Sequence, residues 1–322
     1  MRAGGSLKTK SIMIKDFRFQ QVDVFTKQVF AGNPLAVFTD GEGLSTSQMQ
    51  SIASEMNLSE TTFVTPSTDA RCSARVRIFT PRMELPFAGH PTVGTGYVLA
   101  CAGRLRPDSS GIAYLEENVG PVPLRIEGPA DKPDALFLTA PPIDFGDTFE
   151  ERAAIASSLN VSEPDLVPNA PIQIAGCPPP FLYVALQDPA KVDEVKLNEV
   201  ALLKAIGNQR PPEGVFAFAP SGKPNGFYSR MLGLEHVGVV EDPATGSASA
   251  PLGAYLAYYG LVSGEGRISM LSEQGTKMGR QSFISVIVEK EGKTAKRVEV
   301  GGSVVPVLSG LLPLEVPTKA AA

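Results

Sequence analysis

The chain has 322 residues, of which 43% are hydrophobic and 20% charged, and its formal net charge at pH 7 is −5. This length accommodates two domains with cores of their own, and the composition is that of a globular chain rather than a disordered one. The acidic balance, without any basic run, argues against a nucleic acid or an anionic membrane surface as a partner.

The ends of the sequence carry no targeting or membrane signal. No apolar stretch approaches the roughly 20 residues of a membrane-spanning helix, and the N-terminus lacks the apolar core of a signal peptide. We expect residues 1–12 to be an extension, with Met13 as the natural start, and residues 318–322 to be unstructured.

The three cysteines, Cys72, Cys101 and Cys177, are widely spaced and show no metal-ligand pairing. An odd number without a secretion signal favours free thiols in a reducing compartment, so we expect a cytoplasmic protein. Cys72 and Cys101 fall in apolar runs, which predicts that both thiols are buried. Because the chain has only 2 histidines, we expect no metal site.

Alternating apolar runs in the first half predict strands, interrupted by two helices. Ser45 and Gln48 form a capping-box pattern ahead of an apolar stripe, which predicts a helix that stops at Asn57. A second helix, Val93–Ala102, is rich in small residues. The strands expected from the alternation are Phe17–Thr26, Leu35–Phe38, Thr61–Val64, Ala74–Thr80, Ala113–Glu116, Val122–Glu127 and Ala135–Thr139.

The second half follows the same plan. We expect helices at Phe149–Leu159 and Ala190–Ile206 and a small-residue helix at Ser247–Tyr259. The resulting fold class is α+β rather than doubly wound. We expect an N-terminal lobe at residues 13–130, a C-terminal lobe at 131–302, and a strand near 303–316 that packs back onto the first lobe. The expected strands are Ile172–Ala175, Phe181–Leu186, Val215–Ala219, Phe227–Leu232, Arg267–Leu271, Phe283–Glu289, Arg297–Val300 and Val304–Leu308.

Two similar motifs mark the starts of the small-residue helices. His90-Pro91-Thr92-Val93-Gly94-Thr95 and Asp242-Pro243-Ala244-Thr245-Gly246-Ser247 share an acid/base residue, proline, two residues, glycine and a hydroxyl residue, 152 positions apart (242 − 90). Proline suits the first position of a helix, and the residue before it would then cap an anion-binding N-terminus. This repetition of the motif predicts two similar lobes whose helices point into one cleft.

Taken singly, the candidate side chains have ordinary interpretations. Glu60 is typical of a capping or surface carboxylate, His90 and Asp242 of helix caps, and Ser247 of a serine in the first turn of a helix. The pairing of the two motifs favours a functional interpretation, in which Glu60, from an adjacent loop, joins His90 and Asp242 at the cleft.

Six blocks of sequence carry a resemblance to a known family: Phe30–Phe38, Asn57–Val64, Arg77–Pro81, Glu84–Pro91, Val239–Ala248 and Met278–Arg280. In this order they resemble the phenazine-biosynthesis isomerase (PhzF-like) family, over about Phe17–Leu308. The resemblance implies a diaminopimelate epimerase-like fold, with two similar lobes that each wrap a β-rich, barrel-like sheet around a central helix. It also implies a cofactor-independent isomerase, commonly a homodimer, that acts on a small carboxylate.

The resemblance also assigns roles to individual residues. It implies that Glu60 is the catalytic acid/base and that His90 and Asp242 are polar groups flanking the substrate. Epimerases and racemases related to the family need a cysteine on each motif helix, and no cysteine lies at these places. The substrate-binding residues that it implies are Gly89, Thr245, Gly246 and Ser247.

The sequence thus predicts an isomerase, similar to trans-2,3-dihydro-3-hydroxyanthranilate isomerase, that moves a proton and a double bond in a dihydro-aromatic or allylic carboxylate. One carboxyl group can remove and return the proton if burial and a second carboxylate raise its pKa toward the operating pH. Two alternatives stay open: a non-catalytic protein that binds a small carboxylate, and a two-base epimerase that uses Glu60 with Asp242.

Overall fold

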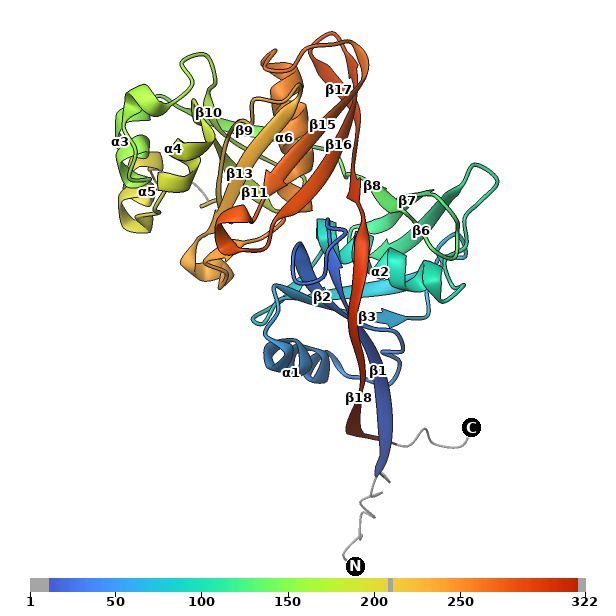
Figure 1. Ribbon diagram of the computed structural model, residues 1–322. Helices are drawn as coiled ribbons and strands as arrows, with labels where there is room; N and C mark the ends of the chain where they lie inside the picture. Colours follow the sequence, from blue (N-terminus) through green and yellow to red (C-terminus); the bar gives the residue numbers. More distant parts are fainter. Residues whose placement is uncertain (1–11, 208–210, 318–322) are drawn as a thin grey trace, which may run out of the picture.

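The computed structural model describes residues 12–207 and 211–317. Of the extension expected at residues 1–12, all but Ile12, which begins the first strand, lies outside the described part of the chain, as does the expected unstructured end at 318–322. Figure 1 shows two β-rich lobes, one with strands β1 to β8 around helix α2 and the other with β9 to β17 around helix α6. The fold is α+β with two similar lobes, as the sequence predicted.

In the N-terminal lobe, helix α1 (Thr46–Met56) lies against the sheet and helix α2 (Gly89–Cys101) lies inside it. Ser45 and Gln48 form the expected capping box of α1, which ends at Asn57 in a left-handed conformation. The strands are β1 (Ile12–Val24), β2 (Asn33–Phe38), β3 (Glu60–Thr65), β4 (Ala74–Phe79), β5 (Glu84–Leu85), β6 (Ile112–Glu117), β7 (Gly120–Glu127) and β8 (Ala135–Thr139).

The C-terminal lobe is built from strands β9 (Asp144–Phe149), β10 (Ile172–Gly176), β11 (Pro180–Ala185), β12 (Gly214–Pro220), β13 (Gly226–Gly233), β14 (Glu241–Asp242), β15 (Gly266–Gln274), β16 (Ser282–Glu291) and β17 (Thr294–Gly302). The final strand of the described chain is β18 (Val304–Pro317). The helices are α3 (Arg152–Ser158), α4 (Pro189–Glu194), α5 (Glu199–Ile206) and α6 (Gly246–Tyr258), with short 3-10 turns at Glu163–Asp165, Glu235–Val237 and Thr276–Met278.

Two predicted helices are wrong in extent. Phe149 ends β9, because it pairs with Ile172 of β10 and its side chain is buried, and helix α3 begins only at Arg152. The single helix expected at Ala190–Ile206 is two helices. Asn198 separates them, because its side chain accepts a hydrogen bond from the backbone N–H of Ala201 and so caps the start of α5.

The two lobes share one order of strand pairing. Each contains a first parallel pair, β2 with β3 and β11 with β12, and a second one, β4 with β6 and β13 with β15. The short strands β5 and β14 lie antiparallel to β4 and β13. An ion pair recurs at this place, Arg77 with Glu84 at 2.6 Å and Arg230 with Glu241 at 2.8 Å. The lobes are therefore a structural duplication.

This duplication fixes which residues correspond. Each short strand stands at the same distance from the helix that follows it, so the first helical residues, Gly89 and Gly246, are equivalent. The offset between the lobes is 157 positions here (246 − 89). The predicted offset of 152 positions is wrong, because the residue equivalent to His90 is Ser247 and not Asp242.

Helices α2 and α6 form the centres of the lobes. Every residue from Gly89 to Ala100 and from Gly246 to Ala257 is buried, as expected for a helix that is apolar on all sides. Strands press closely on these helices: a Cβ added at Gly94 would lie 2.7 Å from Leu35 Cδ2. Cys101, predicted to be buried, is exposed because it ends α2 where the helix leaves the lobe.

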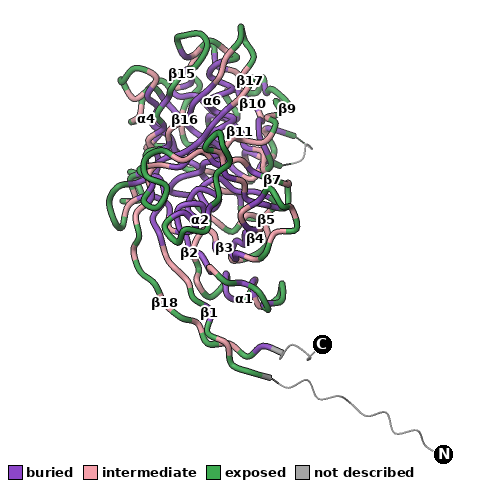
Figure 2. Tube along the Cα trace, turned by 90° about the vertical axis from the view of Figure 1, so that its right-hand side faces the viewer, coloured by how far each residue is buried: buried purple, intermediate pink, exposed green. Residues whose placement is uncertain are grey.

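The lobes are connected by strands as well as by the chain. β8 pairs with β7 on one side and with β17 on the other, so the lobe boundary near residue 130 stays a prediction. β18 leaves the C-terminal lobe and pairs antiparallel with β1, and this ribbon extends away from the body of the molecule (Figures 1 and 2). No helix in the described part of the chain is long and apolar enough to cross a membrane.

Candidate active site

The N-termini of α2 and α6 meet at the interface between the lobes. A Cβ added at Gly89 would lie 2.7 Å from the Cα and carbonyl carbon of Gly246 and from the backbone nitrogen of Ser247. The first N–H groups of a helix have no acceptor within it, and the helix dipole makes this end electropositive. Two such ends in backbone contact form a place that can hold an anion.

The predicted helix starts need correction. Helix α2 begins at Gly89, so His90 is its second residue rather than its cap. Helix α6 begins at Gly246, whereas Asp242 lies ahead of it in β14. Neither motif therefore places its proline at the first helical position. His90 reaches the site from inside a helix and Asp242 reaches it from a strand.

A cavity of approximately 470 Å³ lies beside the two helix ends. None of the described residues that line it is a lysine or an arginine, so a carboxylate ligand would depend on the helix N–H groups. Its polar lining residues are Ser59, Glu60, Thr80, Asp144, Glu213, Asp242, Thr245 and Ser247. Most of the remaining wall is apolar: Met83, Leu85, Pro86, Phe87, Ile174, Pro178, Pro179, Pro180, Phe181, Met231, Val237 and Val239.

His90 is a neutral hydrogen-bond donor at this site. The residue is 3% exposed, and burial lowers its pKa to about 3. The Nδ2 atom of Asn33 donates to Asp242 Oδ1 at 2.8 Å and to the carbonyl oxygen of Ala244 at 2.9 Å, which fixes the orientation of the amide. The same nitrogen lies 3.1 Å from His90 Nδ1. Because an amide nitrogen cannot accept, Nδ1 carries no proton and at most shares one of the two N–H groups of Asn33, so the ring proton is on Nε2.

Asp242 accepts hydrogen bonds from both lobes. Besides the bond from Asn33, its Oδ2 accepts from Thr245 Oγ1 at 2.6 Å. Burial raises the pKa of Asp242, whereas hydrogen bonds from Thr245, Asn33 and Ser59 lower it because they favour the ionised form. Asp242 thus adds a second carboxyl group to the cavity wall.

Glu60 begins β3, and its side chain is 15% exposed. Its Oε2 lies 3.2 Å from His90 Nε2, yet neither atom makes a hydrogen bond with any described residue, because the two groups are close without being aligned. Burial raises the pKa of Glu60 well above its usual value, and the negative charge of Asp242 raises it further. A carboxyl group whose pKa is raised in this way can serve both as an acid and as a base.

Two residues of the site were not predicted. Asn33, interpreted from the sequence as a turn residue, contacts both His90 and Asp242, and Asp242 lies 209 positions away from it in the chain. Gln274, the last residue of β15, donates to the backbone oxygen of Asp242 at 2.7 Å and accepts from the backbone N–H of Thr245 at 3.1 Å. Asn33 lies in one of the recognised sequence blocks, which is a signal that could have identified it; Gln274 carries no such signal.

The other predicted residues lie at the helix ends. Gly89 and Gly246 provide the backbone contact, Thr245 precedes α6, and Ser247 is the second residue of α6. Thr245 and Ser247 line the cavity, but their role in substrate binding stays a prediction. Within the described ranges, no group of three or more His, Cys, Asp or Glu side chains is placed to hold a metal ion.

A family model described as "Phenazine biosynthesis-like protein" matches residues 22–310. The chain belongs to this family. It is 35% identical over 287 residues to the trans-2,3-dihydro-3-hydroxyanthranilate isomerase of Pseudomonas aeruginosa, an alignment that covers 89% of this chain and 95% of the relative. Since the family consists of isomerases, this phenazine biosynthesis-like chain is an isomerase, as its sequence predicted.

Solved structures confirm the fold of this family member. A Bacillus anthracis phenazine biosynthesis protein of the PhzF family superposes with a TM-score of 0.80 at 25% identity, over 92% of this chain and 99% of that one. A hydroxyproline epimerase from Agrobacterium vitis shares the fold with a TM-score of 0.63 at 14% identity, over 93% of each chain. The two-lobed architecture predicted from the sequence is therefore confirmed.

Proposed function

We propose that the chain is a proton-shifting isomerase of a small carboxylate, with Glu60 as its acid and base. The observation that carries this proposal is the pair of Glu60 Oε2 and His90 Nε2, 3.2 Å apart and both without a hydrogen-bond partner among the described residues. Polar atoms that are buried without a protein partner are costly, and a substrate group would remove that cost.

The proposed substrate has a carboxylate and an apolar, unsaturated body. The free N–H groups of the two helix ends would bind the carboxylate, because the lining supplies no cationic side chain. The wall formed by residues such as Phe87, Phe181 and Met231 would enclose a ring or an allylic chain. The substrate class is therefore a dihydro-aromatic or allylic acid, for which trans-2,3-dihydro-3-hydroxyanthranilate is the first compound to test.

In the proposed reaction, the carboxylate of Glu60 removes a proton from one carbon of the substrate. The electron pair left on that carbon delocalises through the adjacent double bond, and the two helix N-termini stabilise the developing negative charge. Glu60, now protonated, returns the proton to a second carbon, so the double bond moves while the composition of the substrate is unchanged. His90 Nε2–H, which has no partner among the described residues, would donate to a substrate oxygen, while burial and the negative charge of Asp242 keep the pKa of Glu60 high.

The duplication favours one base over two. By strand register, Glu60 faces Leu35 in the first lobe, and the equivalent pair in the second lobe is Gly214 with Phe181. The second lobe therefore supplies no carboxylate at the position equivalent to Glu60. This argues against an epimerase with two symmetry-related carboxylates, whereas an epimerase that uses Glu60 with Asp242 is tested by the Asp242→Asn variant. A protein that only binds carboxylates would show ligand binding without proton exchange.

The test is proton NMR of trans-2,3-dihydro-3-hydroxyanthranilate with enzyme in D2O. Where protonated Glu60 exchanges with solvent before it returns the proton, deuterium should enter at the carbon that gains it. Glu60→Gln should lower turnover by about 10²–10⁴-fold. Asp242→Asn should have a milder effect because its hydrogen bonds partly survive. Glu213→Gln, on the same cavity wall, is the matched control and should stay near wild type. Unchanged exchange in Glu60→Gln would place the base elsewhere.

We also infer a homodimer and a cytoplasmic location from the resemblance to the family. Analytical ultracentrifugation of the purified chain tests the first, and a sedimentation coefficient of a monomer at micromolar concentration would contradict it.

A further inference from the structure

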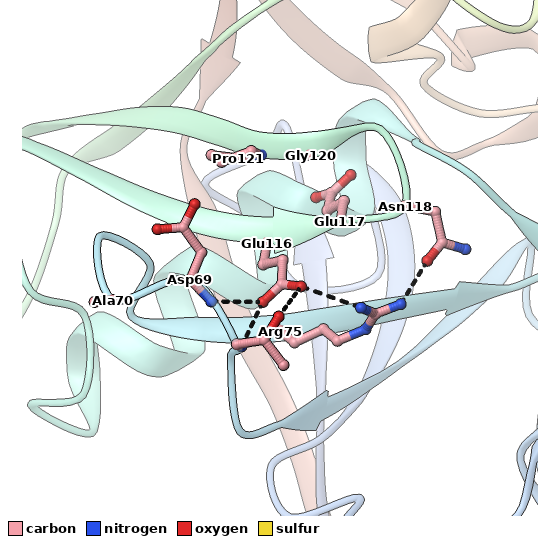
Figure 3. Close-up of a pocket in the computed structure, with 9 residues that line it drawn as sticks. Asp69, Ala70, Arg75, Glu116, Glu117, Asn118, Gly120 and Pro121 are labelled. Carbon is pink, nitrogen blue, oxygen red and sulfur yellow. Dashed lines mark hydrogen bonds and ion pairs between the residues drawn. The ribbon is translucent and has the colours of Figure 1, made fainter.

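Glu117 is a buried carboxyl group that the proposed reaction does not use. It is the last residue of β6, is 3% exposed, and lines a second pocket of approximately 750 Å³ in the N-terminal lobe (Figure 3). Its Oε2 atom has no hydrogen-bond partner within the described part of the chain. A buried carboxyl oxygen without a donor requires an explanation.

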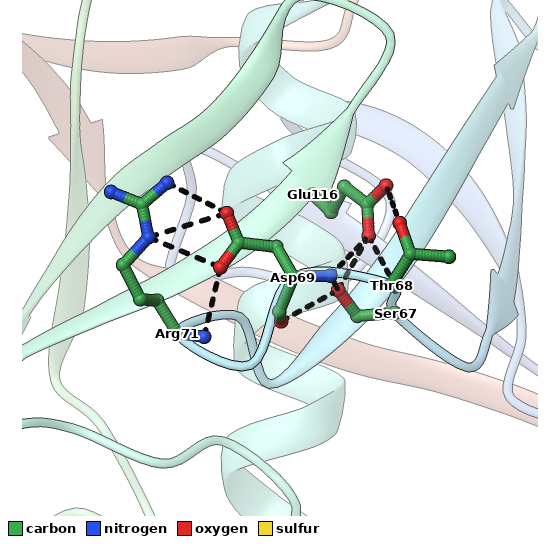
Figure 4. A network of polar contacts seen from close by, with 5 residues as sticks. All are labelled: Ser67, Thr68, Asp69, Arg71 and Glu116. Atoms are coloured by element: carbon green, nitrogen blue, oxygen red, sulfur yellow. Dashed lines mark hydrogen bonds and ion pairs between the residues drawn. The ribbon is translucent and has the colours of Figure 1, made fainter.

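The charged groups around Glu117 are engaged with other partners. Glu116, its neighbour on the strand, pairs with Arg75 at 3.1 Å, as Figure 3 shows. Glu116 also accepts hydrogen bonds from the loop 67–69 (Figure 4). His90, on α2, is neutral. Asp69, which lines the same pocket, pairs with Arg71, and elsewhere in this lobe Arg77 pairs with Glu84.

Glu117 instead contacts the first turn of α2. Its Oε1 lies 2.5 Å from Thr92 Oγ1, and that hydroxyl lies 2.6 Å from the carbonyl oxygen of Ala88, the residue before the helix. A hydroxyl group has one proton, and a carbonyl oxygen can only accept. When Thr92 donates to Ala88, the proton in the contact between Thr92 and Glu117 must therefore belong to Glu117.

The second lobe has a related arrangement, in which the donor contacts the residue before the helix rather than the hydroxyl in its first turn. Ser249, equivalent to Thr92, donates to the carbonyl oxygen of Thr245 at 2.9 Å. Gln274 is equivalent to Glu117, since β6 pairs with β4 as β15 pairs with β13. Its Nε2 donates to Thr245 Oγ1 at 3.0 Å, so a neutral amide supports the start of α6. A protonated Glu117 would supply an equivalent neutral donor to the start of α2.

Burial also favours the neutral form of Glu117. An ionised carboxylate would leave a charged Oε2 buried without any donor, whereas a neutral acid leaves only a carbonyl oxygen unpaired. Burial raises the pKa of Glu117 to about 8. A bond donated by Thr92 to the ionised carboxylate would oppose this rise, whereas a bond donated by neutral Glu117 to Thr92 would not.

We propose that Glu117 is a positioning residue for the active site: as a neutral acid it donates to Thr92, Thr92 donates to Ala88, and this relay fixes the first turn of α2, which carries Gly89 and His90. The activity part of this proposal rests on the proposed function, whereas the protonation state of Glu117 has a readout of its own in the pH dependence of folding.

Two pairs of variants test the relay through activity. Glu117→Gln keeps a neutral donor, as Gln274 does in the other lobe, and Thr92→Ser keeps the hydroxyl; both should stay within about 3-fold of wild-type kcat/KM. Glu117→Leu and Thr92→Val keep the volume and remove the relay, and both should lower kcat/KM by about 10-fold or more, since small displacements of reacting groups are costly. Rescue by the conservative variant separates positioning from packing.

Denaturant unfolding as a function of pH tests the protonation state of Glu117 without a substrate. With the folded pKa near 8 and the ordinary value of 4.5, the native state holds one more proton than the unfolded state between these pH values. The folding equilibrium constant of wild type, relative to Glu117→Gln, should be highest below pH 4.5 and should fall by up to about 10-fold per pH unit toward pH 8. Above pH 8 the ratio should be constant.

Either readout can overturn the proposal. A stability ratio between wild type and Glu117→Gln that is flat or rises with pH would show that Glu117 is ionised in the native state. Loss of kcat/KM in Glu117→Gln equal to that in Glu117→Leu, in folded proteins, would show that no donor is needed. If wild type turns over no substrate, the proposed function fails, but the pH dependence of unfolding still decides whether Glu117 is a neutral donor.

Discussion

Substitution of Gly89 by alanine should separate the two helix ends that form the site. The new Cβ would lie 2.7 Å from the backbone of Gly246, whereas ordinary contacts begin at 3.4 Å, so the backbones must move apart by roughly 0.7 Å (3.4 − 2.7). The overlap is with main-chain atoms, which cannot rotate away as a side chain can. The substitution therefore displaces the N-terminal turns of α2 and α6, which are proposed to bind and orient the substrate.

Two effects follow from this displacement. Overpacking typically costs about 1–3 kcal/mol of unfolding free energy, partly offset by about 1 kcal/mol from the better helix propensity of alanine. A misplacement near 1 Å can cost on the order of 10²-fold in rate, so we expect kcat/KM to fall by about 10²-fold, or about 2.7 kcal/mol of transition-state stabilisation. The loss of activity should thus exceed what the modest loss of stability explains.

Gly96→Ala is the matched control on the same helix. Its Cβ would also lie 2.7 Å from a neighbour, but that neighbour is the Cδ1 of Leu124, a side-chain methyl that can turn away. Denaturant unfolding and deuterium exchange should show Gly96→Ala with near wild-type turnover and Gly89→Ala with the large loss. Equal turnover in the two variants would refute the idea that contact between the helix ends positions the site.

Two further predictions concern other parts of the site. Asn33→Ala removes a donor that His90 shares with the buried carboxylate of Asp242, so we expect a loss of about 1.5–3 kcal/mol in the free energy of unfolding. In ¹⁵N NMR of the His90 imidazole, the single Nε2–H tautomer should be lost. An unchanged tautomer would contradict the assignment of the ring proton to Nε2. Replacing Cys72, Cys101 and Cys177 together by alanine should leave turnover largely intact, because burial raises the pKa of Cys177 to about 12 and keeps it a thiol. Any loss of stability in thermal unfolding should come from the two buried cysteines, Cys72 and Cys177. A triple variant that folds but is inactive would restore a thiol mechanism.

Features with local causes could be predicted from the sequence. The capping box of α1 depends on residues three positions apart, and the alternating strands depend on their own side chains. The correspondence between the lobes depends on distant pairing. The pattern Pro-x-x-Gly occurs at Pro86–Gly89 and again at Pro91–Gly94, and the sequence alone selected the second as the partner of Pro243–Gly246. The pairing of the short strands β5 and β14 ahead of the helices shows instead that Pro86–Gly89 is the equivalent of Pro243–Gly246.

The residues of the candidate site also divide into those that the sequence could predict and those that it could not. Glu60, His90 and Asp242 were named from the resemblance, and the structure brings all three together at one cavity and its edge. Asn33 and Gln274 could not be derived, because their importance comes from contacts with residues that are far away in the chain. The wrong helix starts had a physical cause as well: in both lobes the first helical residue is a glycine whose missing side chain lets the two helix ends touch, and the proline lies elsewhere.

The pairing of β18 with β1 has a consequence for how the chain is made. The N-terminal lobe receives its last strand, Val304–Pro317, only after the whole C-terminal lobe has been synthesised. Until then the outer edge of β1 has no partner, and an unpaired strand edge is a template for pairing with other chains. The lobe that is translated second can thus complete its sheet first, which makes the N-terminal lobe the part of the nascent protein most exposed to misassembly.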